Sequence, residues 1–128
     1  MVRKLFLLDT HAWIEYLIGS DKGRKVKILI DTESCITIEC SLAELHLWAL
    51  KNNRNFDDIY VVVRKNSTII PIFGEDWIES PKIKHELSKK RKDFGLIDAI
   101  LRFKQLKLSA KIVTGDPHFE GLSDSIII

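Results

Sequence analysis

The sequence predicts an α/β protein in which helices cover both faces of a central parallel sheet. Short apolar segments, each typical of a fully buried strand, alternate along the chain with longer segments of helical periodicity. Parallel strands that are buried on both sides need such crossover helices, so the alternation favours a parallel sheet. The length of 128 residues and the 45% of apolar side chains suit one domain with a hydrophobic core, and we expect residues 1–128 to form it.

In the first half of the chain, strands are predicted at residues 4–9 and 34–38, which are short and rich in apolar or β-branched side chains. A helix is expected after the first strand, with Thr10 as its N-terminal cap and with Gly19 and Ser20 at its end. Its apolar face should carry Ala12, Trp13, Tyr16 and Leu17. Amphipathic spacing predicts two further helices, at residues 22–31 and 41–50.

In the second half, residues 56–63 suit a strand by their valines and a helix by their spacing, and we favour the helix. Ser80 and Pro81 are typical of a helix start, which predicts a basic helix from there to about Arg91. A further helical pattern covers residues 95–108. The remaining apolar segments predict strands at residues 68–73, 111–114 and 125–128.

Composition and charge limit the classes of protein to which the sequence can belong. The net charge of +2 and the isoelectric point near 8.5 permit a nucleic-acid partner without requiring one. No segment reaches the roughly 20 apolar residues that cross a bilayer, and the apolar run within residues 1–9 is about half of a signal-peptide core. Cys35 and Cys40 are expected to be small buried side chains without a disulfide. We therefore expect a soluble cytoplasmic protein with no membrane association.

Two aspartates directly follow predicted buried strands. Asp9 closes the apolar run of residues 5–8, and Asp116 comes just after residues 112–114. Ligands of parallel sheets bind at the carboxyl ends of the strands, which makes both side chains candidates for a functional site. A plainer interpretation stays open for each, because Asp9 suits a helix cap and Asp116, which precedes Pro117, suits a turn.

Two further acids lie within apolar helical segments. Glu44 has no basic residue three or four positions away, so its charge needs compensation unless that helix face is exposed. Asp98 is the sole acid in residues 96–101, and Arg102, four positions on, offers a simple ion pair as the alternative.

If these carboxylates converge, they repel one another, and a hard divalent cation would resolve the repulsion. Magnesium or manganese suits carboxylate oxygens. Zinc fits less well, because we find no histidine or cysteine at ligand spacing around these acids. The predicted metal-holding and catalytic residues are therefore Asp9, Glu44, Asp98 and Asp116.

Four short motifs contain these acids in order along the chain: LLDTHAW at residues 7–13, SLAE at 41–44, GLIDAI at 95–100 and VTGDPHF at 113–119. Together they resemble the motifs of PIN domains, particularly the toxins of VapBC-type toxin–antitoxin pairs. The resemblance implies a three-layer α/β/α sandwich, Mg²⁺- or Mn²⁺-dependent cleavage of RNA, a cognate antitoxin partner and a homodimer. Two features depart from it: His118 stands where many members carry another polar or acidic residue, and Pro81 interrupts what is often a longer helix.

On this interpretation the acids bind one or two ions, which lower the pKa of a bound water and neutralise charge on the scissile phosphate. The hydroxyls of Thr10 and Thr114 are placed to orient a carboxylate or a water, although capping and strand packing explain them equally well. Two basic clusters, at residues 22–27 and 82–92, either follow an RNA backbone or are simply solvated.

Three other functions share some of these features. A receiver-type signalling module also holds Mg²⁺, but it needs an acidic pair after the first strand, where this chain has Asp9 and Thr10. A phosphatase of the haloacid-dehalogenase type needs a second aspartate at the position of His11. A PIN fold kept only for binding is the third, and the presence of all four acids favours activity instead.

Overall fold

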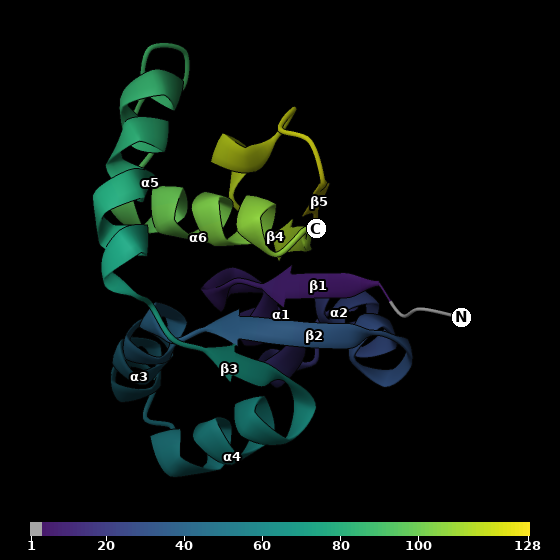
Figure 1. The fold of residues 1–128 in the computed structure, drawn as a ribbon. Helices are drawn as coiled ribbons and strands as arrows, with labels where there is room; N and C mark the ends of the chain where they lie inside the picture. The colour runs from purple at the N-terminus through teal and green to yellow at the C-terminus, as the bar shows by residue number, and fades with distance from the viewer. Residues whose placement is uncertain (1–3) are drawn as a thin grey trace.

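A five-stranded parallel sheet forms the centre of the computed structural model, which describes residues 4–128 (Figure 1). The strand order is β3-β2-β1-β4-β5. The strands are β1 (Leu5–Leu8), β2 (Ser34–Ile38), β3 (Thr68–Ile70), β4 (Lys111–Thr114) and β5 (Ser125–Ile127). Residues 1–3, the first part of the segment weighed as a signal peptide, lie outside the described residues.

Helices cover both faces of this sheet, as expected for an α/β/α sandwich. They are α1 (Thr10–Ile18), α2 (Asp21–Thr32), α3 (Cys40–Lys51), α4 (Phe56–Asn66), α5 (Gly74–Leu87), α6 (Leu96–Lys107) and the short 3-10 helix η1 (Pro117–Phe119). Figure 1 shows α5 and α6 together on one side and α3 and α4 together on another. None of the helices in the described part of the chain has the length and apolar composition that crossing a bilayer requires.

The two helical layers pack on two separate hydrophobic cores, and β1 contributes to both. Phe6 and Leu8 belong to the core under α1 to α4, whereas Leu7 belongs to the core under α5 and α6. This alternation follows from the two-residue period of a strand. The first core also holds Trp13, whose indole Nε1 donates to the Thr37 hydroxyl at 2.9 Å.

The N-terminal cap of α1 differs from the expected one. Its N-terminal cap is Asp9, whose carboxylate accepts the backbone N–H of Ala12 at 2.8 Å, and Thr10 is the first helical residue. An aspartate is at least as good a cap as a threonine, and the chain already leaves the strand at Asp9. The other end is as predicted, because Gly19 adopts the left-handed conformation, with φ of 70°.

The ambiguous segment at residues 56–63 is helical and belongs to α4. Asn55 caps it by accepting the backbone N–H of Asp57 at 2.8 Å. Ile59 and Val63 lie one turn apart and are buried together, so helical spacing outweighs the strand preference of the valines.

Two expectations after residue 66 are wrong in their boundaries. The strand predicted at residues 68–73 ends at Ile70, because Pro71 has no N–H for the ladder and the N–H of Ile72 donates to Glu39 Oε1 at 2.7 Å. The helix predicted to start at Ser80 instead starts at Gly74, with Pro81 inside it, and ends at Leu87 rather than near Arg91.

The earlier start of α5 has a cause in its first turn. Asp76 accepts the backbone N–H of Phe73 at 2.7 Å and is fully buried against Lys104 of α6, with Oδ2 and Nζ 2.5 Å apart. This ion pair lowers the pKa of Asp76, although burial alone would raise it. The contact joins α5 to α6, and only the folded chain brings these residues together. Pro81 costs the helix one backbone hydrogen bond, which this packing tolerates.

The two cysteines are both free, as expected. Cys35 is buried and Cys40 is half-buried, and burial raises the pKa of both thiols to about 11. Both therefore remain protonated at neutral pH.

Gly23 provides a test of how closely α1 and α2 pack. A Cβ atom there would lie 2.0 Å from the backbone oxygen of Glu15, so Gly23→Ala must push the two helices apart. We expect the free energy of unfolding to fall by about 1–3 kcal/mol, measured by urea denaturation. Gly74→Ala is the matched control, because nothing lies within 4 Å of its added methyl group. Equal stability of the two variants would contradict this packing.

Candidate metal centre

The predicted acids come together at the carboxyl edge of the sheet. Asp9, Glu44, Asp98 and Asp116 line one cavity of about 260 Å³, together with Thr10, His11, Ile14, Ile97 and Leu101. Two other hollows of the described surface are larger, about 350 Å³ and 430 Å³, but each is lined by a single carboxylate. The distinguishing property of this cavity is therefore its negative charge rather than its size.

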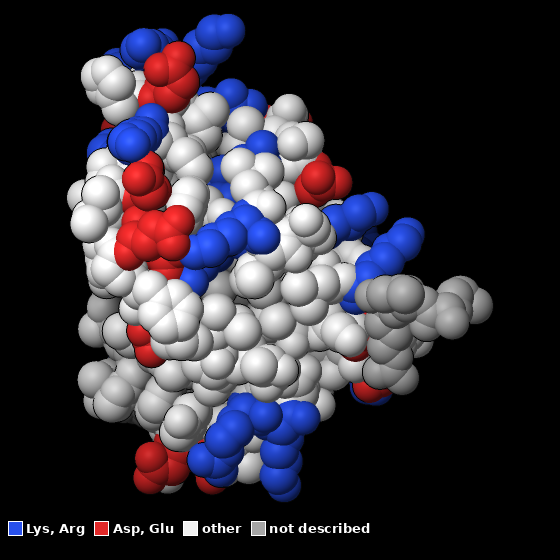
Figure 2. Space-filling model, in the orientation of Figure 1, with Lys and Arg blue, Asp and Glu red and all other residues white. Residues whose placement is uncertain are grey.

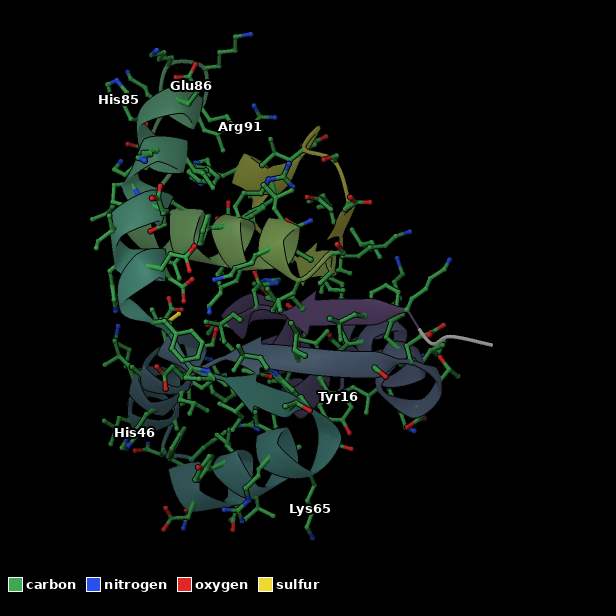
Figure 3. The ribbon with its side chains drawn as sticks, in the orientation of Figure 1. Tyr16, His46, Lys65, His85, Glu86 and Arg91 are labelled. Atoms are coloured by element: carbon green, nitrogen blue, oxygen red, sulfur yellow. The ribbon has the colours of Figure 1, made fainter. Side chains whose placement is uncertain are left out.

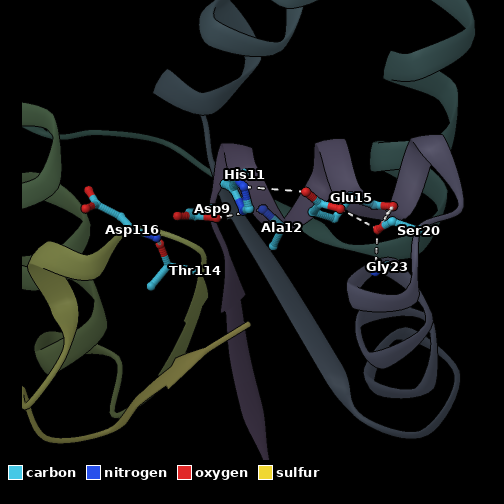
Figure 4. Close-up of polar contacts among 8 residues, drawn as sticks. All are labelled: Asp9, His11, Ala12, Glu15, Ser20, Gly23, Thr114 and Asp116. Carbon is cyan, nitrogen blue, oxygen red and sulfur yellow. Dashed lines mark hydrogen bonds and ion pairs between the residues drawn. The ribbon is translucent and has the colours of Figure 1, made fainter.

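Asp9 is the most buried of the four acids, with 6% of its surface exposed. Burial raises the pKa of Asp9 to about 7, and repulsion from Asp116 and Glu44 adds to the shift. Hydrogen bonds from the Thr114 hydroxyl and the Ala12 N–H oppose the shift without cancelling it. Figure 4 shows the Asp9 carboxylate pointing toward the side on which Asp116 lies. Asp9 is thus both the cap of α1 and a wall of the cavity.

Glu44 is exposed, so the alternative of a partly solvated helix face is correct for this residue. Leu47, on the same face, is also 53% exposed. The Glu44 carboxylate nevertheless points to the cavity, because its Oε1 accepts the hydroxyl hydrogen of Thr10 at 2.8 Å. Thr10, expected to orient a carboxylate or to cap α1, therefore orients a carboxylate.

Asp98 lies in the first turn of α6, where Oδ2 accepts the backbone N–H of Gly95 at 3.1 Å. The alternative ion pair with Arg102 is absent from the described structure. The Arg102 guanidinium instead donates to the Ser123 carbonyl at 2.6 Å and to Gln105 Oε1 at 3.0 Å. Burial raises the pKa of Asp98, and repulsion from Asp116 adds to the rise.

Asp116 forms a turn and also lines the cavity. Its Oδ1 accepts the backbone N–H of His118 at 2.9 Å. Its own N–H donates to the hydroxyl of Thr114 at 2.9 Å, and Figure 4 shows these two residues side by side. The Asp116 carboxylate lines the cavity while it caps η1. Thr114 is buried at the end of β4 and contacts both aspartates, which accounts for a polar residue in that strand.

The expectation that no histidine lies at metal-ligand spacing around the acids is wrong. Ligand atoms of Asp98, Asp116 and His118 lie within 4.8 Å of one another, and His118 Nδ1 is 3.0 Å from Asp116 Oδ1. The pattern Asp-x-His at residues 116–118 was the available signal. It was missed because a two-residue separation brings side chains together only when the backbone turns, as it does at η1.

Arg91 is a second residue whose role the sequence did not reveal. Its guanidinium donates from Nε to the His118 carbonyl at 3.0 Å and from Nη2 to the Glu120 carbonyl at 2.7 Å. Arg91 therefore ties the segment after α5 to η1, which carries Asp116. The prediction that Arg91 belongs to a basic helix surface is wrong for this reason.

The remaining residues of the basic clusters lie mostly at the surface. In the cluster at residues 82–92, Lys82 and Lys89 each pair with a glutamate of α5, and Lys84 donates to the Phe94 carbonyl at 2.8 Å. In the cluster at residues 22–27, Arg24 and Lys27 pair with Asp21 and Asp31. Figure 2 shows Lys and Arg gathered at the α5 end of the molecule, with acids interspersed, and again over α4.

His11 borders the cavity from α1. Its ring packs on Gly115, where an added Cβ would lie 2.1 Å from Nδ1, and its Nε2 is 3.6 Å from Glu15 Oε1. Gly115 thus permits the close approach of α1 to the end of β4.

These features define an α/β protein whose parallel sheet carries a carboxylate-lined cavity at its carboxyl edge. Residues 6–124 match the family model of the PIN domain, so the chain belongs to the PIN domain family. No curated protein sequence matches the chain.

Several solved structures share the fold at low sequence identity. A toxin–antitoxin complex from Klebsiella pneumoniae aligns with a TM-score of 0.77 and 17% identity, covering 94% of each chain. VapBC2 from Rickettsia felis, bound to a DNA fragment from its promoter, aligns with a TM-score of 0.74 and 16% identity, covering 97% of each chain. The sarcin–ricin loop cleaving toxin VapC20 from Mycobacterium tuberculosis aligns with a TM-score of 0.64 and 14% identity, covering 92% of this chain and 95% of that one.

The raised pKa of Asp9 predicts how metal-free stability depends on pH. The folded pKa of about 7 exceeds the ordinary value of 3.8, so the folded state binds more protons than the unfolded state between these limits. Stability is thus greatest below pH 4 as far as Asp9 is concerned, and it is lost as the pH rises through about 7. We expect Asp9→Asn, which keeps the cap of α1, to raise the Tm of metal-free protein by several degrees at pH 8. The gain should shrink at pH 5, and a gain that is the same at both pH values would contradict the pKa assignment.

The tether made by Arg91 predicts a local change in hydrogen exchange. Arg91→Ala should speed exchange of the amides of Phe119, Glu120 and Leu122, whose hydrogen bonds close the turns around η1. Lys92→Ala, at an exposed neighbouring position, is the control and should leave these amides unchanged. Protection that is unaltered in Arg91→Ala would show that η1 does not depend on this tether.

Proposed function

We propose that this chain is a metal-dependent endoribonuclease that hydrolyses RNA phosphodiester bonds at the carboxylate-lined cavity. Asp9, Glu44, Asp98 and Asp116 would be its catalytic, metal-holding residues, with Mg²⁺ or Mn²⁺ as the ion, supported by Thr10 and Thr114. The observation that carries the proposal is the convergence of four carboxylates from distant parts of the chain on one cavity. Membership of the PIN domain family supports the same assignment.

The donor set fits a hard divalent cation. In the described structure, no Lys or Arg forms an ion pair with any of the four acids, whereas Asp76 is paired with Lys104 elsewhere in the fold. Asp9 is almost fully buried with only neutral donors around it. An uncompensated carboxylate cluster is costly, and oxygen-rich sites of this kind suit Mg²⁺ or Mn²⁺.

Some residues of the chain would hold the ion, and others would orient the carboxylates that hold it. When bound, the ion supplies a water of lowered pKa and positive charge beside the scissile phosphate. The hydroxyl of Thr10 fixes the Glu44 carboxylate, and the hydroxyl of Thr114 lies between Asp9 and Asp116. Backbone N–H groups hold Asp9, Asp98 and Asp116, so the acids are oriented before the ion or the RNA arrives.

We further propose that the ribonuclease is the toxin of a toxin–antitoxin pair, acting in the cytoplasm and held inactive by a protein antitoxin. The support is the similarity of the whole chain to the toxin–antitoxin structures, one of which is described as cleaving the sarcin–ricin loop. Three large apolar side chains at the start of α5, Phe73, Trp77 and Ile78, are more than half exposed, which is typical of a surface that a partner covers. A homodimer is part of the same proposal.

Substitution of one site acid tests the proposed activity. Asp98→Asn should lower the rate of RNA cleavage at least 100-fold, because it removes a charge that holds the ion. Cleavage is measured on a labelled RNA with Mg²⁺ or Mn²⁺ and again with excess chelator, which should abolish it. Asp57→Asn, in the exposed first turn of α4, is the control and should cleave like the unaltered chain. Activity that persists in Asp98→Asn or in chelator would overturn the proposal, and RNA binding without cleavage would favour a PIN fold kept for binding.

A further inference from the structure

Beside two of the acids that line the cavity, Asp98 and Asp116, lies a side chain that an all-oxygen metal site does not need. We propose that His118 is a metal ligand beside Asp98 and Asp116, which makes the centre a mixed nitrogen–oxygen site that prefers Mn²⁺ to Mg²⁺. This inference rests on the proposed function, since it concerns the ion held at the same cavity.

The distances between the candidate ligand atoms match those expected between neighbouring ligands of one metal ion. His118 Nδ1 lies 3.0 Å from Asp116 Oδ1, and a ligand atom of Asp98 completes a set whose members lie within 4.8 Å of one another. Adjacent ligands of an octahedral ion with bonds of about 2.1 Å are about 3 Å apart. His118 and Asp116 can therefore share an ion with little movement of either side chain.

Two hydrogen bonds hold the backbone of His118, and one aromatic contact holds its ring. The backbone N–H of His118 donates to Asp116 at 2.9 Å, and its carbonyl accepts from Arg91 at 3.0 Å. The ring meets the edge of Phe94, which is fully buried, with centroids 6.4 Å apart and planes at 70°. One third of the His118 side chain is still exposed, so the ring is fixed but open to an incoming ion.

The competing role for His118 is that of a hydrogen-bond donor to Asp116 only. In that role Nδ1 carries a proton and faces Asp116, and the ring never contacts the ion. The two roles differ in a property of the bound ion: only a ligand nitrogen transfers spin density from Mn²⁺. The imidazole of His11 lines the cavity itself, next to Gly115, and it must therefore be tested separately.

Nitrogen ligation changes which ion the site selects. Imidazole suits first-row transition ions, whereas Mg²⁺ demands oxygen donors. A site with one imidazole and carboxylates therefore binds Mn²⁺ more tightly than Mg²⁺, and removal of the imidazole should erase most of that preference.

Electron spin echo spectroscopy of bound Mn²⁺ tests the inference directly. We expect the unaltered protein to show a ¹⁴N coupling that His118→Asn and His118→Asp both lose. In competition titrations the preference for Mn²⁺ over Mg²⁺ should fall about tenfold in His118→Asn, and His118→Asp should bind Mg²⁺ at least as well as the unaltered chain. His85→Asn is the matched control, because Figure 3 shows His85 near the C-terminal end of α5, and His85 does not belong to the lining of the cavity or to the Asp98, Asp116 and His118 cluster.

The outcomes separate this inference from the proposed function. If Mn²⁺ does not bind, or binds equally well to Asp98→Asn, then the metal centre itself is wrong. If Mn²⁺ binds at the cavity without a ¹⁴N coupling, or if the coupling survives in His118→Asn and disappears in His11→Asn, only the ligand role of His118 is overturned. Thermal unfolding of each variant confirms that the protein measured is folded.

Discussion

Uncompensated negative charge at the carboxyl edge of the sheet is the constraint on which the rest of the site depends. Asp9 lies at the end of a strand that contributes to both hydrophobic cores, so its carboxylate is buried by the same packing that forms the fold. Asp116 and Glu44 then add repulsion rather than relief. An arrangement that raises the pKa of an aspartate to about 7 stores a free-energy cost in the metal-free protein, which a bound cation would remove.

The fold meets this constraint by orienting the acids without neutralising them. Asp9, Asp98 and Asp116 each accept one backbone N–H, and Glu44 accepts the Thr10 hydroxyl. Three of these contacts are also helix-starting contacts, so the capping and the functional interpretations of these residues are not alternatives. A carboxylate that caps a helix is fixed in direction, which is what preorganised binding requires.

Three cationic side chains contact groups other than these acids. Lys104 pairs with Asp76 and joins α5 to α6. Arg91 donates to the carbonyls of His118 and Glu120, and Arg102 donates to the carbonyl of Ser123. Arg91 and Arg102 thereby hold η1, which contains His118 and is capped by Asp116, at the edge of the cavity. These three cations fix elements that carry or adjoin the acids without pairing with the acids themselves, so the cavity stays negative.

The sequence by itself determined the class of fold and the elements that contain the acids. Short apolar runs such as β1 and helical spacing are local properties, so even the ambiguous residues 56–63 were assigned correctly as helix. The four acids were predicted as a set because each stands out against its own apolar neighbours. Whether they converge, and what else converges with them, depends on contacts between residues far apart in the chain.

Those contacts were decided only by the tertiary structure. Arg102 could pair with Asp98 within one helix, but it contacts Ser123 instead because β4 and β5 bring that carbonyl to it. Helix α5 begins at Gly74 because Asp76 pairs with Lys104, which lies 28 positions further along the chain. Arg91 lies outside this helix, and its guanidinium donates to the His118 carbonyl. The spacing of residues along the chain carries no information about such partners. The contacts between them form, and contribute to stability, only once the helices have packed on the sheet.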